Sequence, residues 1–161
     1  MLELEREKLK RDISPLKLYQ PYPYQKGFHY DSNARETLVI GGNRSGKTAS
    51  CAMEFAWAVT GTHPVKGKYP VENANAMVVA QNWNHIGRVI YPYLFKAGAF
   101  KIIRDLDTGI WRAFDFVKDA DRKEEAKPAP PLIPERMIKK KAWVLKASNM
   151  ISYVELENGW N

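Results

Sequence analysis

The stretch Gly41-Gly42-Asn43-Arg44-Ser45-Gly46-Lys47-Thr48 matches the pattern G-x-x-x-x-G-K-[ST] of a phosphate-binding loop. In such loops the glycines allow a tight turn that brings backbone N–H groups close to a polyphosphate. A lysine at the position of Lys47 reaches the β- and γ-phosphates, and the hydroxyl of Thr48 is a ligand for Mg²⁺. The predicted nucleotide-binding residues are therefore Gly41, Gly42, Asn43, Arg44, Ser45, Gly46, Lys47 and Thr48.

The flanking residues fit the context that such a loop needs, a buried strand before it and a helix after it. Residues 37–40 (TLVI) form a short apolar run, and residues 48–59 (TASCAMEFAWAV) hold good helix formers without Gly or Pro. A second apolar run at 76–80 and a helical pattern at 82–94 repeat this order. Strand, helix, strand, helix predicts an α/β fold, a P-loop NTPase of the ASCE type with a parallel sheet flanked by helices.

Gln25 is a candidate for reading the base of the nucleotide. It lies in the segment 24–29 (YQKGFH), shortly before the predicted strand. Its amide can both donate and accept a hydrogen bond, as the N6 amine and N7 of adenine require. The alternative is a surface glutamine on a short helix that buries Phe28.

Composition narrows the class of protein. A chain of 161 residues with 45% hydrophobic residues is expected to fold as one domain. The net charge of +7 favours a polyanionic partner, nucleic acid or nucleotide, although a solvated basic surface explains it equally. The single cysteine, Cys51, rules out a disulfide within the chain, fits a reducing cytoplasm, and is expected to be a small core residue. No apolar stretch is long enough to predict a membrane span.

The chain is predicted to form one partial ATPase domain, 1–161. Residues 1–23 are expected to be a charged helix and a Pro-rich loop, 24–98 to hold the Gln25 segment, the loop and the first βαβ unit, and 99–161 to be a mixed segment with a Pro-rich loop and a terminal hairpin. Residues 150–156 alternate like a strand, and Asn158-Gly159 is a strong turn signal. Since no strand follows that turn, we expect a truncated sequence.

The wording F-H…R-E-T-L-V-I-G-G-N-R-S-G-K-T, followed by E-x-A-W-x-x-T-G-x-x-P, resembles the ATPase domain of phage large terminase subunits, which drive double-stranded DNA into capsids. The likeness runs from about Tyr19 to Leu94 and is weaker near 132–134 and 150–159. It implies ATP and Mg²⁺ as cofactors and double-stranded DNA, the portal and the small terminase subunit as partners. It also implies a location in the host cytoplasm and allows a homo-oligomer.

The resemblance also assigns roles to single residues. Lys47 and Arg44 are implied as catalytic, Arg44 as an arginine finger or γ-phosphate sensor, because a guanidinium is always charged and suits phosphate oxygens. The alternative for Arg44 is a pair with a surface carboxylate. Gln25 stands where the family's adenine-recognising glutamine lies.

The sequence departs from the family at the Walker B strand, where four apolar residues precede Asp-Glu. Asp105-Leu106-Asp107 follows an arginine, and Phe114-Asp115-Phe116 lies too close to Arg112. We therefore expect the Walker B strand, the coupling motif and the nuclease domain to be missing, and this chain to bind ATP without hydrolysing it at a useful rate. The alternatives are a small P-loop kinase and a non-catalytic nucleotide- or DNA-binding module; a helicase is a weaker one.

Overall fold

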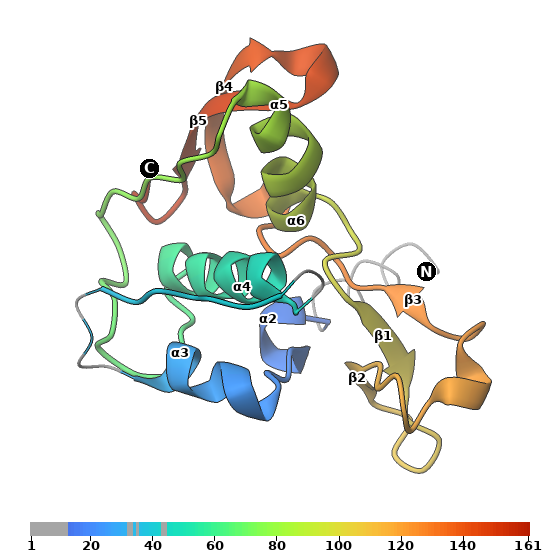
Figure 1. Ribbon diagram of the computed structural model, residues 1–161. Coiled ribbons are helices and arrows are strands. Elements are labelled where there is room, and N and C mark those ends of the chain that lie inside the picture. The colour runs from blue at the N-terminus through green and yellow to red at the C-terminus, as the bar shows by residue number, and fades with distance from the viewer. Residues whose placement is uncertain (1–12, 32–33, 35, 43–44) are drawn as a thin grey trace.

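The computed structural model describes residues 13–31, 34, 36–42 and 45–161. A central helix, α4 (Lys47–Val59), has short helices on one side and a β-hairpin on the other (Figure 1). The other helical elements are α2 (Pro15–Leu18), η1 (Pro23–Gln25), α3 (Lys26–Tyr30), α5 (Trp83–His85), η2 (Ile86–Ile90), α6 (Tyr91–Phe95), η3 (Ala120–Arg122), η4 (Glu135–Met137) and η5 (Lys146–Ser148). The strands are β1 (Lys101–Arg104), β2 (Trp111–Ala113), β3 (Lys127–Pro128), β4 (Ile138–Leu145) and β5 (Met150–Leu156).

Helix α4 forms where good helix formers coincide with apolar residues at helical spacing. It follows Gly46, whose φ of +78° is a left-handed conformation that favours glycine. The hydroxyl of Thr60 donates to the Ala56 carbonyl at 2.6 Å and closes the last turn. The helix predicted over 48–59 is confirmed, and it buries four apolar side chains in the core: Met53, Ala56, Trp57 and Val59.

The segment that carries Gln25 packs against one side of α4. The indole N–H of Trp57 donates to the carbonyl of Leu16 in α2, at 2.9 Å. The ring of Tyr19, just after α2, meets the Trp57 ring edge-on with centroids 5.6 Å apart. These contacts fix the start of the described chain beside the helix that follows the predicted phosphate loop.

The helix predicted over 82–94 is present in three joined pieces, α5, η2 and α6. The side chain of Asn82 accepts a hydrogen bond from the His85 N–H at 3.0 Å and caps α5. The middle piece, η2, is a π-helical turn. A Cβ at Gly87, within this turn, would lie 2.2 Å from the carbonyl oxygen of Ser148. Glycine therefore lets η2 approach the β4–β5 connection.

Strands β4 and β5 form an antiparallel hairpin that pairs from Ile138 opposite Leu156 to Leu145 opposite Met150, with three shifts of register along its length. The strand predicted over 150–156 is confirmed, and its partner precedes it in the chain. The turn that follows, with Gly159 at a φ of +82°, returns the chain to the core, where Trp160 is buried. In this turn, the side chain of Asn158 donates to the carbonyl of Val59 at the end of α4, at 2.9 Å.

A second, three-stranded sheet in the order β2-β1-β3 lies to one side of α4 (Figure 1). β1 is its middle strand and pairs antiparallel with both neighbours. The sheet is small, but Ile102 and Ile103 of β1 are buried. The sequence predicted no definite structure over 100–118, where β1 and β2 lie.

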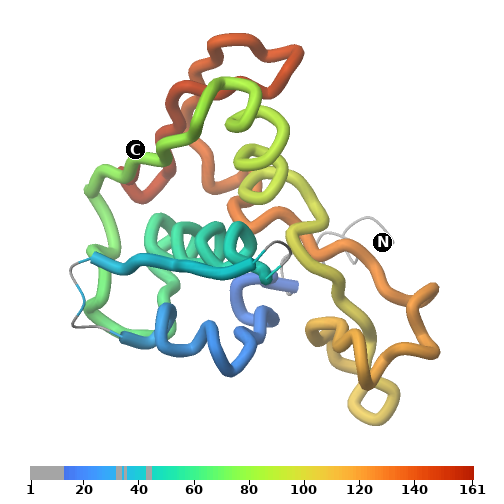
Figure 2. Tube along the Cα trace, viewed as in Figure 1, coloured from blue at the N-terminus to red at the C-terminus, as the bar shows by residue number. Residues whose placement is uncertain are grey.

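The predicted P-loop NTPase fold with a parallel sheet is wrong for the part of the chain that the structure describes. Its five strands form two small antiparallel sheets, and no strand pair there is parallel. Residues 37–40 and 76–80 are extended, but no backbone hydrogen bond joins the two runs among the described residues. Figure 2 shows 36–42 running along α4 and 74–80 leading away toward the C-terminus.

The two runs differ from buried strands in burial as well. The exposed fractions are 83% for Leu38 and Ile40, 84% for Met77 and 78% for Val79. Within the described residues, the second run makes backbone hydrogen bonds only near its start, where Asn161 donates to the Ala74 carbonyl and accepts from the Ala76 N–H. An apolar run predicts a strand only where a neighbouring backbone can pair with it, and the residues themselves do not specify that neighbour.

Candidate functional site

The predicted phosphate loop leads directly into the N-terminus of α4. No side chain caps this end, and Ser50 is the first residue whose N–H bonds back to the Gly46 carbonyl, at 2.9 Å. The N–H groups of the first turn therefore have no partner within the helix. Such groups, together with the helix dipole, favour an anion at this end.

Lys47 lies over the loop. Its ammonium donates to the carbonyls of Gly41 and Gly42, both at 2.7 Å, and is 3.5 Å from the Ser45 hydroxyl. These contacts hold the charge at the mouth of the loop. A phosphate arriving there would exchange neutral carbonyl acceptors for charged oxygens, which form the stronger hydrogen bonds.

Gln25 lies beneath the loop and is only 7% exposed. Its Oε1 accepts from the Tyr22 N–H at 2.9 Å and from the Tyr19 hydroxyl at 3.2 Å. Its amide nitrogen faces Gly46, because a Cβ built on that glycine would lie 2.9 Å from Nε2. In this arrangement Gln25 supports the loop, and its reading of adenine stays a prediction.

An aromatic pair stands beside the loop. The rings of Tyr22 and Tyr24 are stacked, with centroids 5.6 Å apart and planes 5° apart, and both side chains are exposed. The Tyr24 hydroxyl donates to the Ser45 carbonyl at 3.3 Å. The sequence did not single out these tyrosines, although Tyr24 begins the Gln25 segment and Tyr22 lies two residues before it. Exposed stacked aromatics are suited to contact a base face.

An open cleft of about 940 Å³ runs between the Gln25 segment and the residues that precede the loop. Its volume falls within the range of small-molecule sites, about 300–1,000 Å³. The lining brings five of the relevant residues together: Tyr24, Gln25, Gly41, Ser45 and Lys47. Ser50 also lines it, with a buried hydroxyl that lies close to the hydroxyl of Tyr19.

The predicted Mg²⁺ ligand, Thr48, is exposed in the first turn of α4. The described residues contain no group of three or more His, Cys, Asp or Glu side chains that could hold a metal ion. Mg²⁺ commonly binds through substrate phosphates and water with few protein ligands. The role of Thr48 as a Mg²⁺ ligand therefore stays a prediction. The predictions for Asn43 and Arg44 fall on residues outside the described part of the chain.

The sequence did not point to a buried polar cluster between α4, α3 and the loop that follows α4. The Glu54 carboxylate accepts from His29 Nδ1 at 2.8 Å, from the Tyr69 hydroxyl at 2.8 Å and from Lys68 at 2.7 Å. His63 Nε2 lies 3.3 Å away. Burial alone would raise the Glu54 pKa, but hydrogen bonds from His29, Lys68 and Tyr69 lower it to about 2. The available signal was a glutamate flanked by buried apolar positions on α4.

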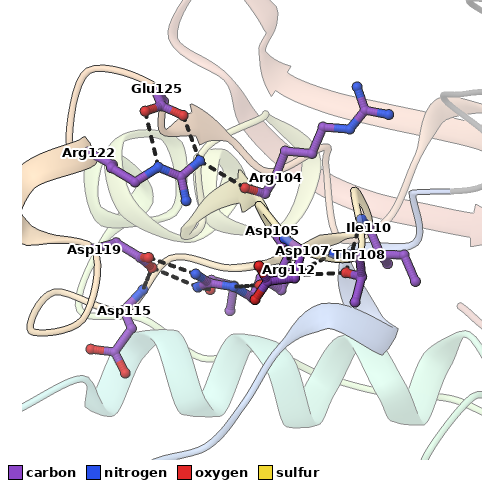
Figure 3. A network of polar contacts seen from close by, with 11 residues as sticks. Arg104, Asp105, Asp107, Thr108, Ile110, Arg112, Asp115, Asp119, Arg122 and Glu125 are labelled. Atoms are coloured by element: carbon purple, nitrogen blue, oxygen red, sulfur yellow. Dashed lines mark hydrogen bonds and ion pairs between the residues drawn. The ribbon is translucent and has the colours of Figure 1, made fainter.

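The acidic residues that came nearest to a Walker B motif serve a different purpose. Figure 3 shows Arg112 between Asp105 and Asp119, with a bidentate pair to Asp119 at 2.7 Å for each bond. Hydrogen bonds from Arg112 lower the pKa of Asp119 to about 2. Asp115 accepts from the N–H groups of Val117 and Lys118 and closes a turn. These carboxylates organise the β1–β2 region, and none of them lines the cleft beside Lys47.

Residues 139–141 are a run of three lysines on β4 that could contact DNA. Lys139 pairs with Glu155, and Lys141 pairs with Glu135. Two of its three charges are therefore compensated locally. This reduces the contribution that the run could make to a DNA-binding surface.

The residues around Cys51 differ from the expectation. Its thiol is exposed and lines a groove of about 500 Å³ between α4 and the extended residues Val39 and Met77. The prediction of a core cysteine is wrong. The runs at 37–40 and 76–80, which were expected to pair as strands over this face of α4, do not cover the thiol.

No family model, no curated protein and no solved structure matches this chain. Within the described residues, no helix combines the length and the hydropathy that crossing a bilayer requires.

Proposed function

We propose that this chain binds the polyphosphate of ATP, carried with Mg²⁺, at Gly41–Thr48. The observation that carries the proposal is the meeting of the complete loop sequence with a helix N-terminus at which Lys47 already lies over the loop carbonyls. Gly46 at positive φ, with Gln25 beneath it, supports this local arrangement. Each of these features arises from residues close in sequence.

The wider role that we propose is that of the ATP-binding part of a DNA-packaging motor of the large terminase type. Support for this step comes from the resemblance of the sequence around the loop and around Trp57, Thr60 and Pro64. Double-stranded DNA, the portal and the small terminase subunit are the proposed partners. The net charge of +7 supports an anionic partner. The proposal for this chain itself is binding, not hydrolysis.

Titration of the chain with Mg-ATP in a calorimeter tests the binding proposal. Lys47→Ala removes a charge-assisted contact to phosphate worth about 1.5–3 kcal/mol, so the Kd should rise about 10- to 150-fold. The matched control is Lys123→Ala, which removes an exposed lysine far from the loop in sequence. Equal affinity in Lys47→Ala and the parent, or equal losses in both variants, would contradict a phosphate site at this loop.

A further inference from the structure

We propose that Tyr19 is a positioning residue for the phosphate loop: its hydroxyl bonds to His29 or to Gln25 according to the protonation of His29, and so makes nucleotide affinity depend on pH. This inference rests on the proposed nucleotide site. It adds a device that links a buried histidine to the loop.

The two acceptors compete for one proton. The Tyr19 hydroxyl lies 3.2 Å from Gln25 Oε1 and 3.3 Å from His29 Nε2. A phenol has a single O–H to donate. Burial raises the pKa of Tyr19, so this proton is retained at neutral pH. Only one of the two contacts can therefore be a full donated bond at a time.

Glu54 fixes which nitrogen of His29 carries the first proton. Its carboxylate, whose pKa is lowered to about 2, accepts only. His29 Nδ1, at 2.8 Å from it, is therefore the N–H donor. In neutral His29 the other nitrogen, Nε2, must then be an acceptor, and it attracts the Tyr19 proton away from Gln25.

A second proton on His29 reverses this bond. Nε2–H then donates to the Tyr19 oxygen, and the Tyr19 O–H is released to donate to Gln25 Oε1. That bond adds to the one from the Tyr22 N–H and holds the Gln25 amide against Gly46. Gly46 is the residue at which the loop ends and α4 begins. Protonation of His29 should therefore stabilise the loop and strengthen nucleotide binding.

Charged and titratable side chains face His29 from several elements. From α4 the facing charge is the Glu54 carboxylate. From the loop after α4, Lys68 donates to the backbone carbonyl of His29 at 2.7 Å and pairs with Glu54. His63 and Tyr69 approach the same carboxylate from that loop, and Tyr19 faces His29 from the other side. The Glu54 carboxylate therefore faces both the Lys68 ammonium and the His29 ring.

The test compares two Tyr→Phe variants in the same network. Tyr19→Phe removes the switching hydroxyl and keeps the ring that packs on Trp57 and Phe100. Tyr69→Phe is the matched control, because its hydroxyl reaches Glu54 but makes no hydrogen bond to Gln25. The Kd of Mg-ADP is measured at about pH 6 and about pH 8, on either side of ordinary histidine titration. Using one nucleotide throughout cancels its own protonation.

For each protein the measured quantity is the ratio of the Kd at about pH 8 to the Kd at about pH 6. This ratio should be about 2- to 10-fold larger in the parent and in Tyr69→Phe than in Tyr19→Phe, which is the effect that one hydrogen bond allows. The same pH ratio in all three proteins would overturn the proposal. A pH ratio lost equally in both variants would also overturn it, since the hydroxyl of Tyr19 would then have no separate role.

A second readout needs no nucleotide and separates this proposal from the proposed function. The side-chain amide signal of Gln25, followed by nitrogen-15 NMR, should shift with the protonation of His29 in the parent and in Tyr69→Phe, but not in Tyr19→Phe. A Gln25 signal that does not respond to pH in the parent refutes the switch. A signal that responds while no nucleotide binds refutes the proposed site instead.

Discussion

Replacing Glu54 by glutamine should remove a large part of the stability of this chain. Four polar groups converge on the carboxylate, and the His29 side chain that it binds is fully buried. A glutamine keeps the shape but turns one acceptor oxygen into a donor, which then faces His29 or Lys68. Removing one partner of a buried charged pair costs about 3–5 kcal/mol.

The pKa of Glu54 gives an independent magnitude. Lowering it from 4.5 to about 2 corresponds to about 3 kcal/mol of folding free energy at neutral pH. A domain of this size is stable by about 5–15 kcal/mol, so the loss is a substantial fraction of the total. For an unfolding slope of about 1–3 kcal/mol per molar urea, the midpoint should fall by about 1–3 M.

The assay is urea unfolding followed by tryptophan fluorescence and circular dichroism. Trp57 reports directly on the cluster, since its ring lies 5.1 Å from that of His29 and 5.5 Å from that of His63. Glu125→Gln is the control, because Glu125 is exposed and pairs with Arg122 at the surface. Exposed pairs often contribute nothing measurable, so its midpoint should match that of the parent.

The pH dependence has a definite sign. The folded-state pKa of Glu54 is lowered, so its contribution is complete above the unfolded value of 4.5 and is lost as the pH falls toward about 2. The stability difference between the parent and Glu54→Gln should therefore narrow across that range. Near-equal midpoints at neutral pH, or a difference that does not change between neutral and acid pH, would refute this account of the cluster.

Two further changes test the packing around α4. Gly87→Ala should lower the free energy of unfolding by about 1–3 kcal/mol, and the thermal midpoint with it, because the added Cβ would lie 2.2 Å from a backbone oxygen. Alanine would otherwise favour a helix, so an unchanged or higher midpoint contradicts the close approach. Asn158→Ala should cost about 1 kcal/mol by removing donors to the carbonyls of Val59 and Val71. Amide hydrogen exchange should then become faster in the C-terminal turn of α4, and unchanged protection there would argue against a stabilising contact from Asn158.

Local features of this chain were predictable, and pairing between distant segments was not. The helix after the loop and the strand at 150–156 each follow from a periodic pattern within one short segment. The partner of that strand, β4, begins with three lysines in its first four residues and shows no simple alternation. The runs at 37–40 and 76–80 have the composition of strands, yet their exposure depends on neighbours that the runs do not encode.

The same distinction applies to the site. The Gly46 turn and the Lys47 contacts arise within the motif, so the sequence located them. The contacts that hold the loop from below could not be predicted from the motif. Gln25 is held by Tyr19 and Tyr22, and His29 is held by a glutamate that lies 25 residues later. Each of these residue types is common at surfaces, and only the packing of α3 on α4 turns them into a buried network.

Because the described residues form no parallel sheet, other contacts must hold the predicted phosphate loop in place. A central sheet would fix the loop from the strand that precedes it, but residues 37–40 have no backbone partner among the described residues. The contacts that remain come from the other direction, through Gln25 against Gly46, Tyr24 on Ser45 and the Glu54 cluster behind α3. If these contacts position the loop, nucleotide affinity should depend on the Tyr19–His29–Glu54 chain more than on the apolar side chains of Leu38 and Ile40. That order of sensitivity is the reverse of what a loop supported by a central sheet would give.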